Sequence, residues 1–248
     1  MMSSKLNFFT NYARLFALVM VVISITSFAS NAQVISSIED INAQRKASIY
    51  NKTDDFNIGN FLNGRVYPMK YIGVANSQFV FGDYLLKGDI VYDGVEFKNR
   101  LIQYDTYKQL IVMEVNHGES RFILSLDRDK VSEMIIDGRR FISYEDSVLE
   151  KNIYEIPYDG IQAKALIYRT RTQSRVGSSA RVYYELDPVN RYYVVNQYGT
   201  FRINGKKDMI KAFGEEKKMK DIIKRNKLKF GKNTIYGGMV KALSLYED

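Results

Sequence analysis

Residues 90–97 read Ile90-Val91-Tyr92-Asp93-Gly94-Val95-Glu96-Phe97, with apolar residues on both sides of an Asp-Gly pair. Asp-Gly supplies the two positive-φ residues that a type I′ turn requires, and this turn joins adjacent antiparallel strands. The same pattern recurs at Ile135-Ile136-Asp137-Gly138-Arg139-Arg140-Phe141-Ile142 and, more loosely, at Tyr158-Asp159-Gly160-Ile161. The sequence therefore predicts antiparallel hairpins at these three places.

Short apolar runs surround the hairpins, and turn signals separate them by 8–12 residues, which is typical of antiparallel sheet. Further strands are expected at 78–81, 101–104, 109–113, 121–126, 165–168, 181–186, 191–195 and 201–203. The polar residues 170–180 are expected to form a loop. Residues 187–190 (Asp-Pro-Val-Asn) are expected to form a turn between the strands beside them, because Pro presets φ and Asp accepts a local hydrogen bond. Residues 61–204 are thus predicted to be a mainly β (α+β) domain, with an antiparallel meander or sandwich-like sheet.

The period of the apolar residues changes after Asn204. Asn204 is a candidate N-cap of a first helix, with Met209 and Phe213 on its apolar face. Residues 215–216 are both Glu and open a second helix with basic residues near its end, as the helix dipole favours. A last helix fits residues 239–246. We expect residues 205–248 to form a basic helical tail packed on the same domain.

The first residues have the order of a signal peptide. Lys5 and Arg14 precede an apolar run over residues 15–28, and small residues allow a cut after Ala32. The run is shorter than the ~20 residues that span a bilayer as a helix. We therefore predict a cleavable signal peptide over residues 1–32, with an uncleaved N-terminal anchor as the alternative.

Residues 33–60 are expected to form an N-terminal arm, in which the spacing of the apolar residues weakly fits one short helix. The chain has no Cys. An exported domain that folds without disulfides is typical of a bacterial envelope. The predicted location is the periplasm or the outer cell envelope of a Gram-negative bacterium.

The formal charge of the whole chain, +8, is unevenly distributed. Residues 205–232 hold eleven Lys and Arg against four acids, whereas residues 33–204 are close to neutral. Nine of these cations are candidate contacts to an anionic surface: Lys206, Lys207, Lys211, Lys217, Lys218, Lys220, Lys224, Arg225 and Lys227. The expected partner is an anionic membrane or lipopolysaccharide surface, or another envelope protein, and no nucleic acid. The alternative is the solvated face of helices whose apolar stripe packs on the sheet.

Tyrosine is abundant, with nineteen residues. Tyr183, Tyr184, Tyr192 and Tyr193 occur as two adjacent pairs in the predicted strands 181–186 and 191–195. Successive side chains of a strand point to opposite faces, so one tyrosine of each pair faces away from the core or into a second layer. They are therefore a candidate aromatic surface for a glycan or peptide, with cross-strand packing as the alternative.

The sequence gives no catalytic, metal or cofactor signature. His117 is the single His, so neither a Ser-His-Asp triad with a Gly-x-Ser-x-Gly elbow nor a usual zinc set is expected. No phosphate-binding glycine loop is found. A glycosidase-type hydrolase needs only two carboxylates. Available carboxylates are Asp105, Asp127, Asp129, Glu145 and Asp146.

The mature chain resembles uncharacterised exported proteins of Gram-negative envelopes. The resemblance rests on Tyr92-Asp93-Gly94, on Leu101-Ile102-Gln103-Tyr104-Asp105 and on the Lys-rich end over residues 206–230. It implies the compartment but no activity and no site residue. The first hypothesis is a non-enzymatic envelope protein with a binding or structural role, which acts through its sheet surface and basic tail. The alternatives are an exported carboxylate-dependent hydrolase and a small outer-membrane β-barrel. A barrel needs strands of 9–11 residues, which are longer than most strands expected here.

Overall fold

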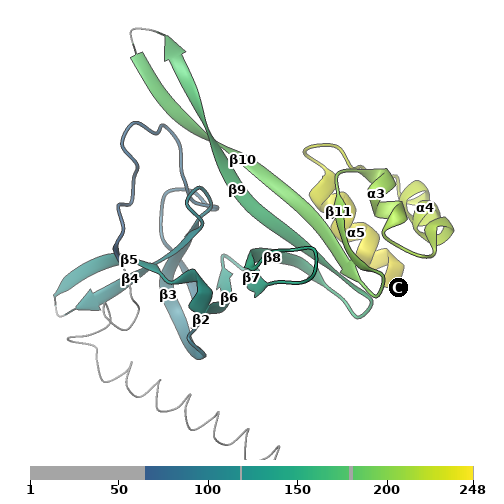
Figure 1. Ribbon diagram of the computed structural model, residues 1–248, viewed down its shortest axis with the longest axis horizontal. Coiled ribbons are helices and arrows are strands. Elements are labelled where there is room, and N and C mark those ends of the chain that lie inside the picture. Colours follow the sequence, from purple (N-terminus) through teal and green to yellow (C-terminus); the bar gives the residue numbers. More distant parts are fainter. Residues whose placement is uncertain (1–64, 118, 179–180, 248) are drawn as a thin grey trace, which may run out of the picture. The chain divides into compact units, whose positions relative to one another are not determined.

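The structure is a computed structural model that describes residues 65–117, 119–178 and 181–247 (Figure 1). The predicted signal peptide and N-terminal arm lie outside these residues. The strands are β1 (Arg65–Val66), β2 (Leu86–Tyr92), β3 (Val95–Asp105), β4 (Leu110–His117), β5 (Ser120–Leu126), β6 (Val131–Ile136), β7 (Arg139–Tyr144), β8 (Asn152–Asp159), β9 (Ala163–Ser178), β10 (Arg181–Asn196) and β11 (Gly199–Ile203). The helices are the 3₁₀ turn η1 (Arg128–Lys130), α3 (Lys206–Lys211), α4 (Glu216–Arg225) and α5 (Ile235–Glu247).

Hydrogen bonds join the strands into one antiparallel sheet of order β1-β5-β4-β3-β2-β6-β7-β8-β9-β10-β11. Strands β2 to β5 form one meander, and the chain then returns through η1 to place β6 on the free edge of β2. A second meander continues from β6 to β11. The prediction of a mainly β fold followed by a helical C-terminal segment is confirmed.

The two close hairpins have the predicted turns. Asp93 and Gly94 have φ of 51° and 77°, and Asp137 and Gly138 have φ of 51° and 71°. Both residues of each turn therefore occupy the left-handed region, as a type I′ turn demands. In the looser third hairpin, Asp159 and Gly160 are not the central turn residues. The N–H of Gly160 donates to the carbonyl of Ala163 (3.0 Å), so the turn lies between these two residues.

The predicted loop over 170–180 and the predicted turn over 187–190 are wrong. Residues 170–178 of the predicted loop belong to β9, and residues 187–190 belong to β10; the two strands have 16 residues each and form one long ribbon (Figure 1). Pro188 is tolerated because its nitrogen faces away from β9. Its partner Arg171 donates its N–H outward, to the carbonyl of Thr106 (3.1 Å), so this pair exchanges no ladder hydrogen bonds. Proline in a sheet is confined to such free edges.

Two smaller predictions also fail. Residues 78–81 do not form a strand; only Phe79 makes an isolated bridge, to Asp105. Helix α3 is capped at Gly205 rather than at Asn204. The Asp208 carboxylate instead accepts the backbone N–H of Asn204 (2.9 Å). A side chain inside the first turn thus reaches back to the residue before the cap.

Two large hydrophobic cores lie along the sheet, beside two smaller ones, one of which contains Tyr154 and Tyr193. The first gathers side chains of β2 to β8, including Tyr104 and Phe141. The second gathers side chains of β9, β10 and β11 under the three helices, including Ile167 and Val194. Burying these apolar faces is the main favourable term for such a fold, at about 25 cal/mol per Å². None of the described helices is long and apolar enough to cross a bilayer.

A buried ion cluster stands where the two cores meet. Glu155 of β8 is 1% exposed and pairs in register with Phe141 of the first core and Ile167 of the second. Its carboxylate accepts a hydrogen bond from the Arg169 side chain of β9. The Arg139 guanidinium of β7 lies 3.7 Å from its other oxygen. The cluster therefore ties three neighbouring strands together.

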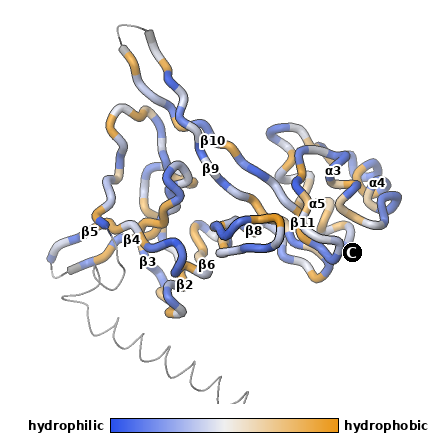
Figure 2. Tube along the Cα trace, viewed as in Figure 1, coloured by the Kyte–Doolittle hydropathy of each residue, from blue (hydrophilic) through white to orange (hydrophobic). Residues whose placement is uncertain are grey.

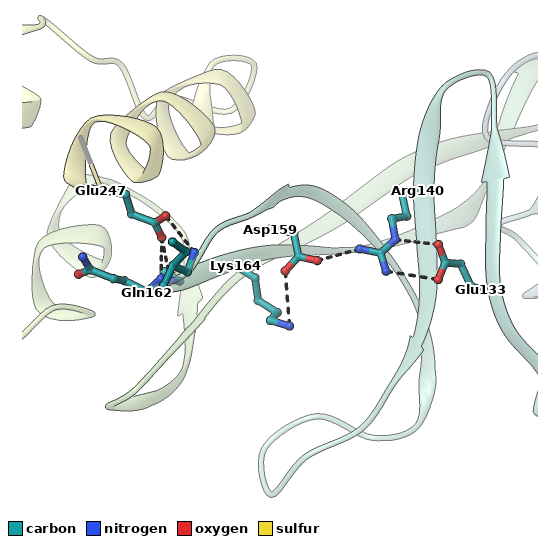
Figure 3. A network of polar contacts seen from close by, with 8 residues as sticks. Glu133, Arg140, Asp159, Gln162, Lys164 and Glu247 are labelled. Atoms are coloured by element: carbon teal, nitrogen blue, oxygen red, sulfur yellow. Dashed lines mark hydrogen bonds and ion pairs between the residues drawn. The ribbon is translucent and has the colours of Figure 1, made fainter. Parts of the chain in front are cut away.

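The last helix is fastened to the sheet at its end (Figure 3). The Glu247 carboxylate accepts hydrogen bonds from the backbone N–H groups of residues 161–163, at 2.9–3.0 Å. Gly160 leaves room for it, since a Cβ there would lie 2.3 Å from a Glu247 oxygen. Partial burial acts to raise the pKa of Glu247, but these donors outweigh it and hold the pKa below the usual 4.5.

Candidate functional site

The C-terminal helices form a layer on one face of the sheet. Helix α3 contacts β11, α5 contacts β8 and β9, and α4 packs on α3 and α5. Met209, from the predicted apolar face of the first helix, is fully buried in the second core, as are Met219 and Ile223 of α4. Hydrophilic and hydrophobic segments alternate along this part of the chain (Figure 2). Figure 1 shows α4 at the outer edge of the layer.

The nine predicted cation contacts are all exposed on this layer. None of them is in an ion pair with a carboxylate of the residues that the structure describes. Lys218 differs from the others because its ammonium donates to the Tyr246 carbonyl (2.9 Å) and lies 4.2 Å from the centre of that ring. Lys218 therefore fastens α4 to α5, and eight cations remain for an outside partner.

Helix α4 carries the most regular part of this charge. Lys217, Lys220 and Lys224 are three and four residues apart, so they lie along one side of the helix. At 1.5 Å per residue their Cα atoms span about 10 Å. Met219 and Ile223 point inward on the same helix, so packing fixes which side faces out. We call Lys217, Lys220 and Lys224 the α4 stripe.

The four tyrosines of the predicted aromatic surface do not come together. Tyr193 is 9% exposed and packs edge-on against Tyr154. Tyr192 is half-buried against the second core. Tyr183 and Tyr184 lie eight to ten residues away on the outer half of β10, about 26 Å or more along the strand. Core and cross-strand packing thus account for Tyr192 and Tyr193, and only Tyr184 is appreciably exposed, at 38%.

Three of the five carboxylates available to a hydrolase, Asp105, Asp127 and Asp146, accept hydrogen bonds from the fold itself. Asp105 is fully buried and accepts from the hydroxyls of Tyr67 (2.6 Å) and Tyr71 (2.5 Å). Its other oxygen accepts two backbone N–H groups of the following turn, both at 2.8 Å. Burial and the nearby carboxylate raise the pKa of both phenols, so they stay protonated donors. Asp146 similarly accepts the N–H groups of residues 148 and 149.

A cavity that the sequence did not reveal lies beside the helical layer. Its volume is about 620 Å³, and it is bounded by β10, the end of β11 and the loop before α5. The lining residues are Asp187, Pro188, Val189, Asn190, Arg191, Tyr192, Ile203, Asn204, Gly231, Lys232, Asn233 and Ile235. These segments are far apart in sequence, so no local motif could have pointed to the cavity.

The described residues contain no group of three or more His, Cys, Asp or Glu side chains placed to hold a metal ion. Comparison with models of protein families, with curated proteins and with solved structures gives no match.

Proposed function

We propose that this is an exported, non-enzymatic envelope protein that docks on an anionic lipid surface through the exposed cations of its helical layer. The observation that carries the proposal is the α4 stripe on the outer edge of a layer whose cations lack carboxylate partners among the described residues. Export rests on the predicted signal peptide.

The electrostatics favour a partner over a merely solvated face. Each Lys or Arg close to an anionic membrane contributes about 1 kcal/mol of attraction. The attraction decays within a Debye length, about 8–10 Å near physiological salt. Cations on the outermost helix can approach a surface within that distance together, whereas the same number scattered over the molecule cannot. The rest of the chain is near neutral, so attraction orients the helical layer toward the surface.

The test measures binding of the purified protein to vesicles made of equal parts phosphatidylglycerol and phosphatidylcholine. Replacing Lys217, Lys220 and Lys224 with Gln should remove about 3 kcal/mol, which weakens binding roughly 100-fold. Raising the salt from about 0.1 M to about 1 M shortens the Debye length to about 3 Å and should release the wild type.

The matched control replaces three exposed lysines of the β-rich part, Lys70, Lys87 and Lys98, with Gln. This variant has the same net charge as the stripe variant, and its vesicle binding should stay within about threefold of the wild type. Equal loss in both variants would show that overall charge, and not the helical layer, governs binding. Wild-type binding to phosphatidylcholine alone would also contradict the proposal.

A further inference from the structure

The cavity beside the helical layer lies at a gap in the edge of β10. Strand β11 pairs with β10 only as far as Ile203, which lies opposite Tyr192. The chain then leaves the sheet for α3, and residues 187–191 continue without β11 beside them. Towards the tip of the ribbon, Ala75 and Gly73 hydrogen-bond β10 again at position 184. The cavity therefore faces a stretch of strand edge between two paired stretches.

The direction of the backbone groups in this gap follows from the ribbon. Asn190 pairs with Arg169, whose carbonyl points outward and accepts from Gln109 (3.0 Å). In a pair that exchanges no hydrogen bonds, the backbone N–H and C=O of each residue point away from the other strand. The N–H and C=O of Asn190 therefore point toward the cavity. Pro188, two residues before Asn190, has a carbonyl that points to the same side and no N–H. The edge thus presents one donor and two acceptors.

The rest of the lining supplies a mixed set of groups. Ile203 and Ile235 are buried and give an apolar floor, and the half-buried Tyr192 adds an aromatic wall. Lys232 and Asn233 stand on the loop before α5 and contribute a cation and an amide. A volume of about 620 Å³ is within the 300–1,000 Å³ that small-molecule pockets have.

We propose that this cavity binds a phosphorylated sugar. Asp187 also lines it, and its carboxylate would oppose a bare phosphate but accepts hydrogen bonds from hydroxyl groups. The Lys232 ammonium suits the phosphate, the outward backbone groups and amides suit several hydroxyls, and Tyr192 suits the apolar face of a sugar ring. The cavity proposal rests on the proposed docking in one respect only. The docking is the reason for assigning the sugar phosphate to a lipid head group.

The test titrates the purified protein with glucose 1-phosphate, glucose and inorganic phosphate, and follows backbone amides by NMR. Saturable shifts should appear at Asn190 and Asn233 with glucose 1-phosphate, at least tenfold tighter than with either fragment. Replacing Lys232 with Gln should weaken this binding five- to tenfold. The control, Lys241→Gln, removes an exposed lysine of α5 outside the lining and should leave it unchanged.

Equal responses to inorganic phosphate, shifts spread over residues 206–227, or no saturation would overturn the cavity proposal. The vesicle assay tests the docking proposal independently of the cavity proposal, because the stripe variant loses vesicle binding but keeps an intact cavity. Vesicles bearing a sugar-phosphate lipid then distinguish the sources. A lipid head group predicts that Lys232→Gln weakens binding to these vesicles more than binding to phosphatidylglycerol vesicles, and a free sugar phosphate predicts an equal change for both.

Discussion

Replacing Arg169 with Met would leave the Glu155 carboxylate charged inside the sheet without its closest partner. Removing one member of a buried ion pair costs about 3–5 kcal/mol, because the remaining charge stays desolvated. Arg139 lies 3.7 Å from the other carboxylate oxygen and retains part of the attraction, but it is 45% exposed. We therefore expect a loss of about 3 kcal/mol in the free energy of unfolding. For a domain of this size that corresponds to a fall in Tm of about 6–12 °C.

The assay is urea unfolding of the wild type, Arg169→Met, Glu155→Met and the double variant. Removing both charges should restore stability to within about 1 kcal/mol of the wild type, since hydrophobic replacements of buried ion pairs are often neutral. The coupling energy should then be about 2 kcal/mol or more. Arg175→Met, on the exposed outer half of β9, serves as control and should cost less than about 0.5 kcal/mol. Additive losses in the double variant would refute the argument that Glu155 depends on Arg169.

Three further substitutions test carboxylate contacts that stabilise the fold. Glu247→Gln should lower stability by about 1 kcal/mol at neutral pH, because charged acceptors bind N–H groups more strongly than amides. Its pKa is lowered on folding, so this stabilisation is present above 4.5 and is lost as pH falls through the folded pKa; urea unfolding at pH 7 and in acid should show the two proteins converging. Gly160→Ala should displace the same carboxylate, and combined with Glu247→Gln the losses should not add in thermal unfolding. Asp105→Asn should cost about 2–3 kcal/mol by urea unfolding, more than Tyr71→Phe, because it deprives four donors of a charged acceptor.

The parts of the fold that the sequence predicts are those governed by local chemistry. Asp93-Gly94 and Asp137-Gly138 specify their turns because the need for two positive φ angles involves no distant residue. The ribbon of β9 and β10 could not be predicted in the same way. Pro188 fits inside β10 because its register with β9 turns its nitrogen to the other edge, and because β11 stops before it and leaves that edge free. The turn signal at 187–190 was therefore overridden by long-range pairing.

The candidate site also combines features that the local sequence predicts with features that depend on long-range contacts. Exposure of the α4 stripe follows from the buried Met219 and Ile223, which are visible as a helical period in the sequence. The pairing of Lys218 with Tyr246 joins residues 28 apart and has no local signal. Adjacent tyrosines such as Tyr192 and Tyr193 look alike in sequence, yet each packs in a different core on opposite faces of the sheet.

The way the helical layer is attached also decides which lysines can report on docking. Lys218 holds α4 against α5 through Tyr246, whose hydroxyl in turn donates to Glu215 (3.3 Å). Helix α5 is held to the sheet through Glu247. Replacing Lys218 would remove a charge and loosen the layer together, so a loss of binding would have two causes. The α4 stripe has no such role among the described contacts, so its replacement changes the charge while leaving the attachment of the layer intact.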